Sequence, residues 1–125
     1  MNRVVYEGAT NLTITCKSNA SYLDWEISPF AVPEFFDSSS IYLTTNGEPS
    51  PSFNDIFAID HSQGTEVYSI VVFNATIFPP DNTTFSTAGV YLCRNSEQNY
   101  IYLVHLVVIR KYELPTVQLF KSTIV

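Results

Sequence analysis

The sequence predicts an all-β fold, a sandwich of two sheets joined by one inter-sheet disulfide. The chain has only two cysteines, Cys16 and Cys93, and its single tryptophan, Trp25, follows the first of them by nine residues. The second cysteine completes a Tyr91-x-Cys93 triplet that comes directly after the small residues of 86–89. This order and spacing is typical of a two-sheet sandwich whose tryptophan packs against the disulfide. We therefore expect Cys16 to pair with Cys93, with Trp25 and Tyr91 in the core.

The length of 125 residues favours one domain, and a hydrophobic content of 46% is enough to build a core. A Cys16–Cys93 bridge would close a loop of nearly eighty residues, which the disputed chain-entropy model values at about 4–5 kcal/mol. Structural disulfides persist in oxidising compartments. We therefore expect an extracellular location, either on a cell surface or secreted.

Four Asn-x-Ser/Thr sequons support the same location. They begin at Asn11, Asn19, Asn74 and Asn82, and none has proline in the middle. Such triplets mark acceptors for N-linked glycans in secreted proteins. The alternative is that they are chance matches in a chain rich in Asn and Thr.

The charge and the motif content exclude several function classes. A net charge of −6 does not suit nucleic acid or anionic membrane surfaces, which attract basic proteins. We find no metal-binding or nucleophile motif around the two histidines, His61 and His105, and no glycine-rich phosphate loop. We expect no enzyme activity in this domain, no cofactor and no metal site, and His105 at a sheet surface.

The first strands are predicted from alternation. A short edge strand is expected over 4–6. Over 11–17 the alternation places Leu12, Ile14 and Cys16 on the core face and the threonines between them outside. The next strand, over 23–27, turns Leu23, Trp25 and Ile27 inward and Asp24 and Glu26 outward.

The signal is weaker over 28–64, where four prolines interrupt regular structure. Residues 41–45 still form a strand pattern, and Asn46-Gly47 after them is a hairpin-turn dipeptide. A further short strand is expected over 55–60. This segment is longer than a minimal seven-stranded sandwich needs.

The remaining strands are expected over 66–78, 90–95 and 100–109. Both faces of the first are apolar, and a glycan on Asn74 would have to point outward, which turns Val71 and Phe73 inward. A polar hairpin over 95–99 joins the last two strands. The domain is expected to end at residue 110, and 111–125 is interpreted either as a linker with the first strand of a following domain or as a disordered tail.

One face of the sheet containing the last two strands is predicted to bind protein. No sequon falls between residues 22 and 73 or after 85, so glycans would leave this sheet bare. The strand over 100–109 is apolar on both faces, and one of them must lie outside the core. Exposed apolar stripes mark contact surfaces. The predicted contact residues are Leu92, Tyr100, Tyr102 and Val104; the alternative is that a loop or neighbouring domain covers them.

These motifs resemble immunoglobulin-superfamily domains, and the likeness covers most of the chain. The matching segments are Leu-Thr-Ile-Thr-Cys at 12–16, Leu-Asp-Trp at 23–25, Thr-Ala-Gly-Val-Tyr-Leu-Cys at 87–93 and Tyr-Ile-Tyr-Leu-Val at 100–104. The resemblance implies an immunoglobulin-like two-sheet sandwich. The long 28–64 segment leaves room for the extra strands of a variable or intermediate type. The alternatives it implies for partners are a protein ligand or another immunoglobulin-like domain.

A narrower resemblance is to the membrane-distal first domain of the platelet-derived and vascular endothelial growth factor receptor kinases. This resemblance rests on Leu-Asp-Trp at 23–25, Gly-x-Tyr-x-Cys at 89–93, Ile-Tyr-x-Val at 101–104 and Pro115 in the expected linker. The chain departs from the family at Thr87, where an aspartate is usual, and in its proline-rich 28–64 segment. The likeness implies the N-terminal module of a growth-factor or cytokine receptor. The alternatives are a cell-adhesion domain that pairs through the same bare sheet and a secreted decoy, of viral origin or otherwise.

Overall fold

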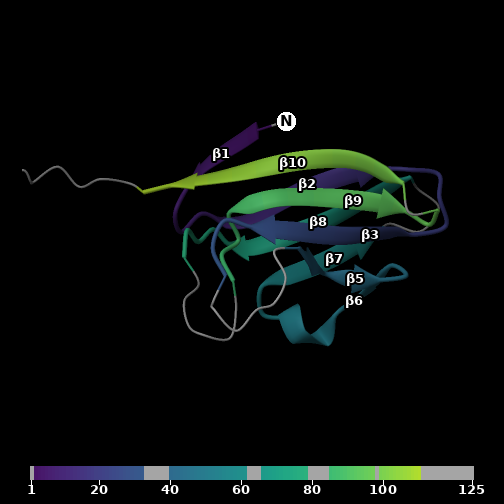
Figure 1. Cartoon of the computed structure of the whole chain (residues 1–125), viewed down its shortest axis with the longest axis horizontal. Coiled ribbons are helices and arrows are strands. Elements are labelled where there is room, and N and C mark those ends of the chain that lie inside the picture. The colour runs from purple at the N-terminus through teal and green to yellow at the C-terminus, as the bar shows by residue number, and fades with distance from the viewer. Residues whose placement is uncertain (1, 33–39, 62–65, 79–84, 98, 111–125) are drawn as a thin grey trace, which may run out of the picture.

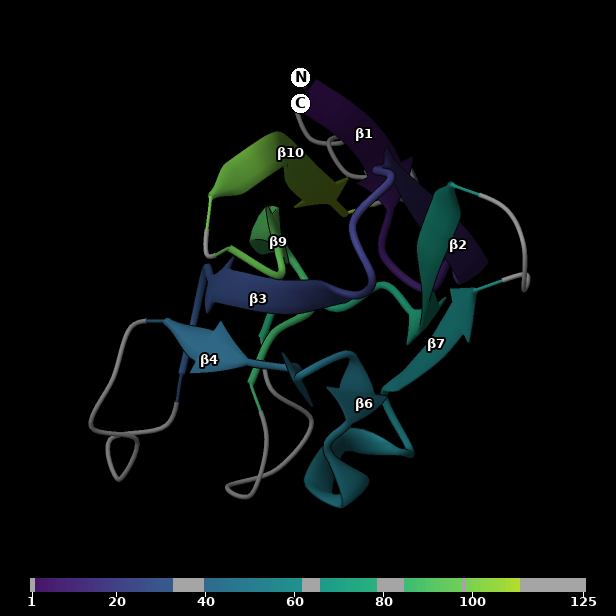
Figure 2. The ribbon, with the colours of Figure 1, turned by 90° about the vertical axis from the view of Figure 1, so that its right-hand side faces the viewer.

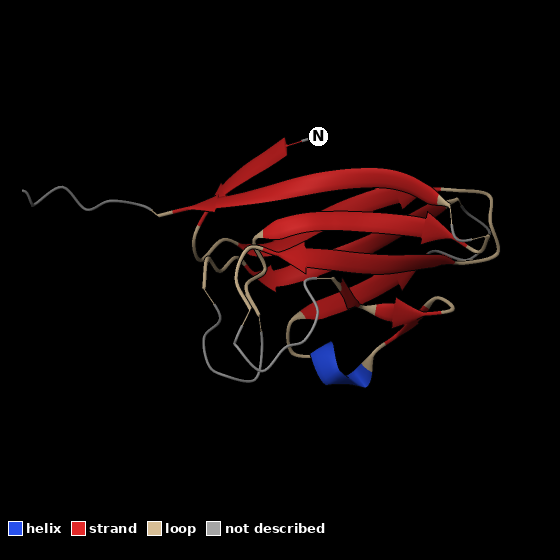
Figure 3. Cartoon of the chain, in the orientation of Figure 1, coloured by secondary structure: helices blue, strands red, loops and turns tan. Residues whose placement is uncertain are grey.

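The computed structural model describes residues 2–32, 40–61, 66–78, 85–97 and 99–110, which are almost entirely strand and loop (Figures 1 and 3). The strands are β1 (Asn2–Tyr6), β2 (Thr10–Lys17), β3 (Leu23–Pro29), β4 (Ile41–Tyr42), β5 (Thr44–Thr45), β6 (Glu48–Pro49), β7 (Phe57–His61), β8 (Val67–Asn74), β9 (Gly89–Asn95) and β10 (Tyr100–Ile109). One 3-10 turn, η1 (Pro51–Phe53), precedes β7. No helix in these ranges is long and apolar enough to cross a membrane.

Two sheets pack face to face (Figure 2). The larger has the order β1-β10-β9-β3-β4 and the smaller the order β2-β8-β7, while β5 and β6 form a separate hairpin. All pairs in the two sheets are antiparallel except β1 with β10, which is parallel. The expected all-β immunoglobulin-like sandwich is confirmed.

The predicted cross-link and core residues are confirmed. Cys16 on β2 and Cys93 on β9 form a disulfide between the sheets, with a sequence separation of 77. Trp25 lies opposite Cys93 in the β3–β9 ladder, and its side chain is buried. Tyr91 is buried too, and its hydroxyl donates a 2.6 Å hydrogen bond to the Thr87 carbonyl. This bond ties the chain entering β9 to the core, as in the tyrosine corner of such sandwiches.

The register predicted for β2 is correct, and the register predicted for β8 is wrong. Leu12, Ile14 and Cys16 are buried and the threonines between them are exposed. On β8, however, Tyr68, Ile70 and Val72 are buried, while Val71 and Phe73 lie on the other face and are half-buried. Asn74 is the last residue of β8, and its side chain is exposed although it shares the parity of the core residues.

Several predicted strand limits differ from the structure. The expected 41–45 strand is divided at Leu43, which is buried and whose amide donates to the Trp25 carbonyl over 2.8 Å. The predicted turn is confirmed, since Asn46 and Gly47 have φ values of 51° and 83° and join β5 to β6. The predicted strand over 4–6 is the second part of β1, which begins two residues earlier, and the one over 55–60 is β7, which begins two residues later and ends one residue later. The expected domain end, with its linker over 111–125, and Asn82 concern residues outside the described ranges.

Candidate functional site: the outer face of the five-stranded sheet

The outer face of the larger sheet brings together side chains from five strands. We call it the recognition face. Its central row crosses four strands, because Leu103 on β10 lies opposite Leu92 on β9, Leu92 opposite Glu26 on β3, and Glu26 opposite Tyr42 on β4. Neighbouring positions of β1 and β10 extend it through the pairs of Val4 with Val107 and of Tyr6 with Ile109. Side chains of paired residues project from the same face of a sheet.

Large apolar side chains are exposed over most of this face. The exposed members are Val4, Tyr6, Tyr42, Tyr100, Leu103 and Ile109. Tyr100 is 60% exposed and Leu103 46%. Single exposed apolar residues are ordinary, but a group that spans one sheet face is characteristic of a contact surface. Tyrosine is also enriched at such surfaces, because its ring packs while its hydroxyl remains hydrated.

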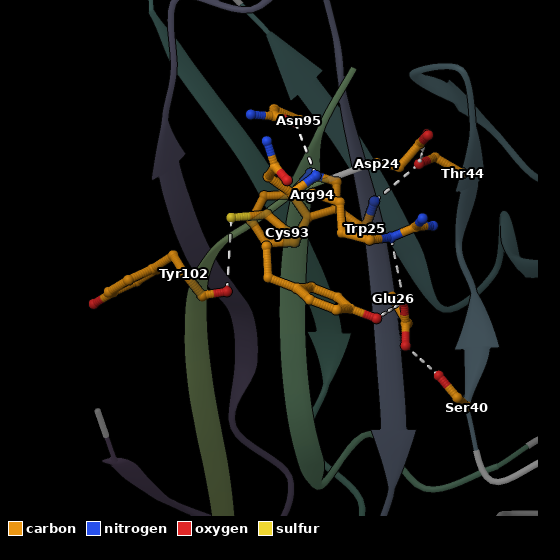
Figure 4. Close-up of polar contacts among 11 residues, drawn as sticks. Asp24, Trp25, Glu26, Ser40, Thr44, Cys93, Arg94, Asn95 and Tyr102 are labelled. Carbon is orange, nitrogen blue, oxygen red and sulfur yellow. Dashed lines mark hydrogen bonds and ion pairs between the residues drawn. The ribbon is translucent and has the colours of Figure 1, made fainter. Parts of the chain in front are cut away.

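A polar cluster lies within the recognition face (Figure 4). The Arg94 Nε atom is 3.4 Å from Glu26 Oε1, and both side chains are largely buried. The Arg94 Cζ atom lies 4.8 Å from the ring centre of Tyr42 and 6.0 Å from that of Tyr100. A guanidinium within about 6 Å of an aromatic ring is attracted by the ring's negative face. Arg94 therefore attracts both tyrosine rings while it pairs with Glu26.

The Glu26 carboxylate has further partners besides Arg94. Ser40 donates to Glu26 Oε2, and the Tyr100 hydroxyl donates to Oε1 over 3.4 Å. Buried charges need such partners, since an isolated buried carboxylate is strongly destabilising. Glu26 points outward, as predicted, but it is only 5% exposed because Arg94, Ser40 and Tyr100 contact its carboxylate.

Asp24 is likewise outward and buried, because the β5–β6 hairpin covers it. Its Oδ1 atom accepts hydrogen bonds from the Thr44 hydroxyl over 2.6 Å and from the Gly47 amide over 2.8 Å. The Thr44 hydroxyl in turn accepts a 2.9 Å bond from the Trp25 amide. This chain of bonds fixes the hairpin against β3, beside the recognition face.

The four predicted contact residues do not all belong to this face. Leu92 and Tyr100 do. Val104 does not, because it is only 4% exposed and its side chain lies in the core. Tyr102 is partly exposed but lies opposite Cys93 and lines the groove between β10 and β2. The register shift between Tyr100 and Tyr102 is the reason, since it places these two tyrosines on different faces.

Among the six exposed apolar members of the face, sequence reasoning named only Tyr100. It missed Leu103 and Ile109 of β10 and three contributors from other strands. Val4 and Tyr6 were assigned to an edge strand with no partner, and Tyr42 to a strand of unknown position. The parallel pairing of β1 with β10, and the pairing of Glu26 with Tyr42, bring them to this face. Opposite charges on predicted neighbouring strands, at Glu26 and Arg94, were the one available signal for the ion pair.

The sequons within the described ranges lie away from the recognition face. Asn11 is on β2, Asn74 ends β8, and Asn19 follows β2 in the loop to β3; all three side chains are exposed. Their exposure is compatible with glycans, and whether they carry any stays a prediction.

The described ranges hold no group of three or more metal-ligating side chains. His61 stacks on Tyr68, with ring centres 3.8 Å apart, and His105 is exposed on the recognition face, as predicted. Burial raises the pKa of the Tyr91 hydroxyl well above its usual value, so this group stays protonated and structural. The recognition face offers binding chemistry: apolar area, three tyrosine rings and an internally neutralised charge.

Comparison of the chain with protein-family models and with curated proteins returns no match.

Proposed function

We propose that this domain is an extracellular immunoglobulin-like module that recognises another protein through the recognition face. The single observation that carries the proposal is the group of exposed apolar and aromatic side chains on one sheet face. A surface of this composition excludes water favourably when a partner covers it. Its central ion pair is already formed in the free protein, so binding would not have to order it.

Two features support an extracellular location. The Cys16–Cys93 disulfide is buried between the sheets, and such bonds persist in oxidising compartments. The described sequons are exposed and spare the recognition face. Glycans at these positions would keep the smaller sheet and the strand ends solvated and leave the recognition face accessible.

The finer proposal is the N-terminal domain of a multi-domain growth-factor or cytokine receptor. It rests on the resemblance of the 23–25, 89–93 and 101–104 motifs to the first domain of receptor kinases. Where that family usually has an aspartate, the Thr87 hydroxyl here accepts a 2.8 Å bond from the Thr76 amide and donates a 2.9 Å bond to the Asn74 carbonyl. Thr87 thus provides a neutral link between the ends of β8 and β9.

A binding screen tests the proposal. The full chain, multimerised to raise avidity, is tested against an array of secreted and cell-surface ectodomains. Leu103→Asp places a charge in the centre of the recognition face and is expected to weaken a specific interaction at least tenfold. Val67→Asp is the matched control, because Val67 is 37% exposed and lies on the outer face of the smaller sheet. The proposal would be contradicted if only Val67→Asp lost binding, or if both variants bound as well as the wild type.

A cell-adhesion domain is the second candidate, and the same face favours it. An apolar sheet face can pair with its own copy about a two-fold axis. Analytical ultracentrifugation of the full chain at rising concentration distinguishes the candidates: an adhesion domain self-associates and Leu103→Asp abolishes the dimer, whereas a receptor first domain stays monomeric. The parent sequence distinguishes a receptor from a secreted decoy. A membrane span and a kinase downstream of this domain would indicate a receptor, and their absence would indicate a decoy.

A further inference from the structure

The outer edge of β2 is a second feature that the recognition face does not include. Within the described ranges, β2 is the edge strand of the smaller sheet, paired only with β8. Two contacts establish which of its backbone groups point away from β8. The Ser18 amide donates to the Glu66 carbonyl over 2.9 Å, toward the β8 side, while the Thr13 carbonyl accepts from Arg3 Nη1 on the β1 side.

The direction of backbone groups alternates along an antiparallel strand. Even-numbered residues of β2 therefore bond to β8, and the amides and carbonyls of Thr13, Thr15 and Lys17 point to the open edge. An edge strand with outward backbone groups is a template for a further strand. Strand addition here would give hydrogen-bond partners to backbone groups of β2 that, within the described ranges, do not pair with β8.

A groove runs along this edge. Its wider part, about 430 Å³, is lined by Thr15, Cys16 and Lys17 of β2 and by Ile101 and Tyr102 of β10. It continues as a part of about 230 Å³ that reaches Arg3 and Thr13. Figure 2 views the sandwich from one end and shows the ribbon of β1 between those of β10 and β2. The walls provide apolar area and the edge provides directional hydrogen bonds.

The charges at the two ends of the groove select the occupant. Arg3 lies at one end and Lys17, which is exposed, at the other. None of the lining residues is acidic. Thr13 and Lys17 are four residues apart, about 13 Å along a strand. Pairing of two copies through β2 would bring these cations near one another, which disfavours a second copy of this chain.

From these observations we infer that the β2 edge binds an extended acidic segment of a partner protein, which adds to the smaller sheet as a fourth strand. Two carboxylates four residues apart in the incoming segment lie on one face of it and reach Lys17 and Arg3. Arg3 then exchanges its bond with the Thr13 carbonyl for a carboxylate, and the incoming amides bond to the β2 carbonyls. This site is separate from the recognition face and does not depend on the function proposed for it.

The test is a titration of the full chain, followed by amide chemical shifts. The probe is a nine-residue peptide of alternating valine and threonine with two glutamates four positions apart. Saturable shifts are expected at Thr13, Thr15 and Lys17 and at Tyr102 across the groove. Replacing the glutamates with lysine, or N-methylating the amides that face β2, is expected to weaken binding at least tenfold.

Protein variants locate the site. Lys17→Glu is expected to raise the dissociation constant of the glutamate peptide about tenfold or more. Arg110→Glu makes the same charge change at an exposed residue that pairs with Glu7 rather than lining the groove, and is expected to change the constant less than twofold. Leu103→Asp should leave peptide binding intact, which separates this site from the recognition face.

Three results of the titration would overturn the inference. They are the lack of a saturable shift at millimolar peptide, equal binding of the lysine peptide, and shifts confined to the recognition face. Protection of the Thr13 and Thr15 amides from hydrogen exchange in the free protein would also overturn it, because the edge would then be covered by another part of this chain.

Discussion

At the residue scale, Tyr91 shows how one buried hydroxyl can fix a chain connection. Its bond to the Thr87 carbonyl joins two groups that are both buried. Tyr91→Phe leaves that carbonyl without this donor, and we expect it to lower the free energy of unfolding by about 1–3 kcal/mol. Urea denaturation measures the change. Tyr6→Phe, at an exposed position, is the control and should stay within about 0.5 kcal/mol. Equal effects of the two substitutions would contradict this account of the corner.

The same tyrosine predicts how stability depends on pH. Burial raises the pKa of Tyr91 in the folded state, whereas in the unfolded chain it titrates near 10. Above pH 10 the unfolded state therefore binds fewer protons, and stability falls as pH rises. One such proton contributes a slope of about 1.4 kcal/mol per pH unit. Unfolding free energies between pH 9 and 11 are expected to fall less steeply in Tyr91→Phe than in the wild type. Parallel curves for the two proteins would show that Tyr91 is not responsible.

The Glu26–Arg94 pair predicts coupled effects of substitution. Removing either partner leaves a largely buried charge without its counter-ion, so Glu26→Gln and Arg94→Met should each cost about 2–4 kcal/mol, the value for a buried pair reduced for partial exposure. The double variant removes both charges and should cost less than the sum of the single variants. Denaturation of all four proteins completes the cycle. If the double variant lost as much unfolding free energy as the two single variants together, the charges would not interact.

At the element scale, alternation predicts a strand only where its two faces differ. The faces of β2 differ strongly, apolar against threonine, and its register was correct from the sequence. On β8 valine, isoleucine and phenylalanine occur on both faces, so the register depended on one assumption about Asn74, and the outcome was wrong. Alternation gave the outward direction of Asp24 and Glu26 correctly. It could not give their burial, because that depends on β4 and on the β5–β6 hairpin, which pack over β3 from more distant parts of the sequence.

The recognition face, like the strand registers, could be predicted from the sequence only in part. Its sheet could be named, because Cys93 fixes the parity of β9 and the sequons lie elsewhere. Of its members on β10 only Tyr100 was named correctly, because a bulge between Tyr100 and Tyr102 reverses which residues face outward along the rest of the strand. Bulges leave little trace in a sequence of apolar residues. The cluster of two tyrosines around Arg94 likewise requires the β3–β4 register, which no local pattern contains.

The junction of β9 with β3 predicts a strong effect at Gly89. Its φ of +148° is a backbone conformation that side chains disfavour, and an added Cβ would lie 2.3 Å from the Ser28 carbonyl oxygen. Gly89→Ala must therefore displace the β3 backbone, and we expect a loss of about 3 kcal/mol or more. Gly8→Ala is the matched control, since its φ is +90° but no atom lies within 4 Å of the added Cβ. It should cost about 1–2 kcal/mol in backbone conformation alone. Similar unfolding midpoints for the two variants would contradict the steric argument.

At the scale of the whole molecule, the two sheets have opposite surface character. The smaller sheet and the strand ends carry the described sequons and have threonines along β2, while the larger sheet exposes tyrosine, valine, leucine and isoleucine. The disulfide and Trp25 join the layers but do not determine which layer binds. That difference lies in the outward residues, which the fold leaves free to vary. It makes a glycan a selective probe, because a glycan blocks the face on which it sits.

Glycan placement therefore predicts which sheet a partner covers. Leu103→Asn with His105→Thr creates a sequon in the centre of the recognition face, and Thr13→Asn moves the β2 sequon from Asn11 to position 13, on the smaller sheet. In secreted protein, with occupancy measured by mass spectrometry, the first glycan is expected to abolish binding or self-association through the recognition face. The second should leave both unchanged and instead block strand addition at the β2 edge. Binding that survives a fully occupied glycan at position 103 would mean that the partner does not cover this sheet. Loss of binding with both glycans would mean that the contact extends around the β1 side of the sandwich.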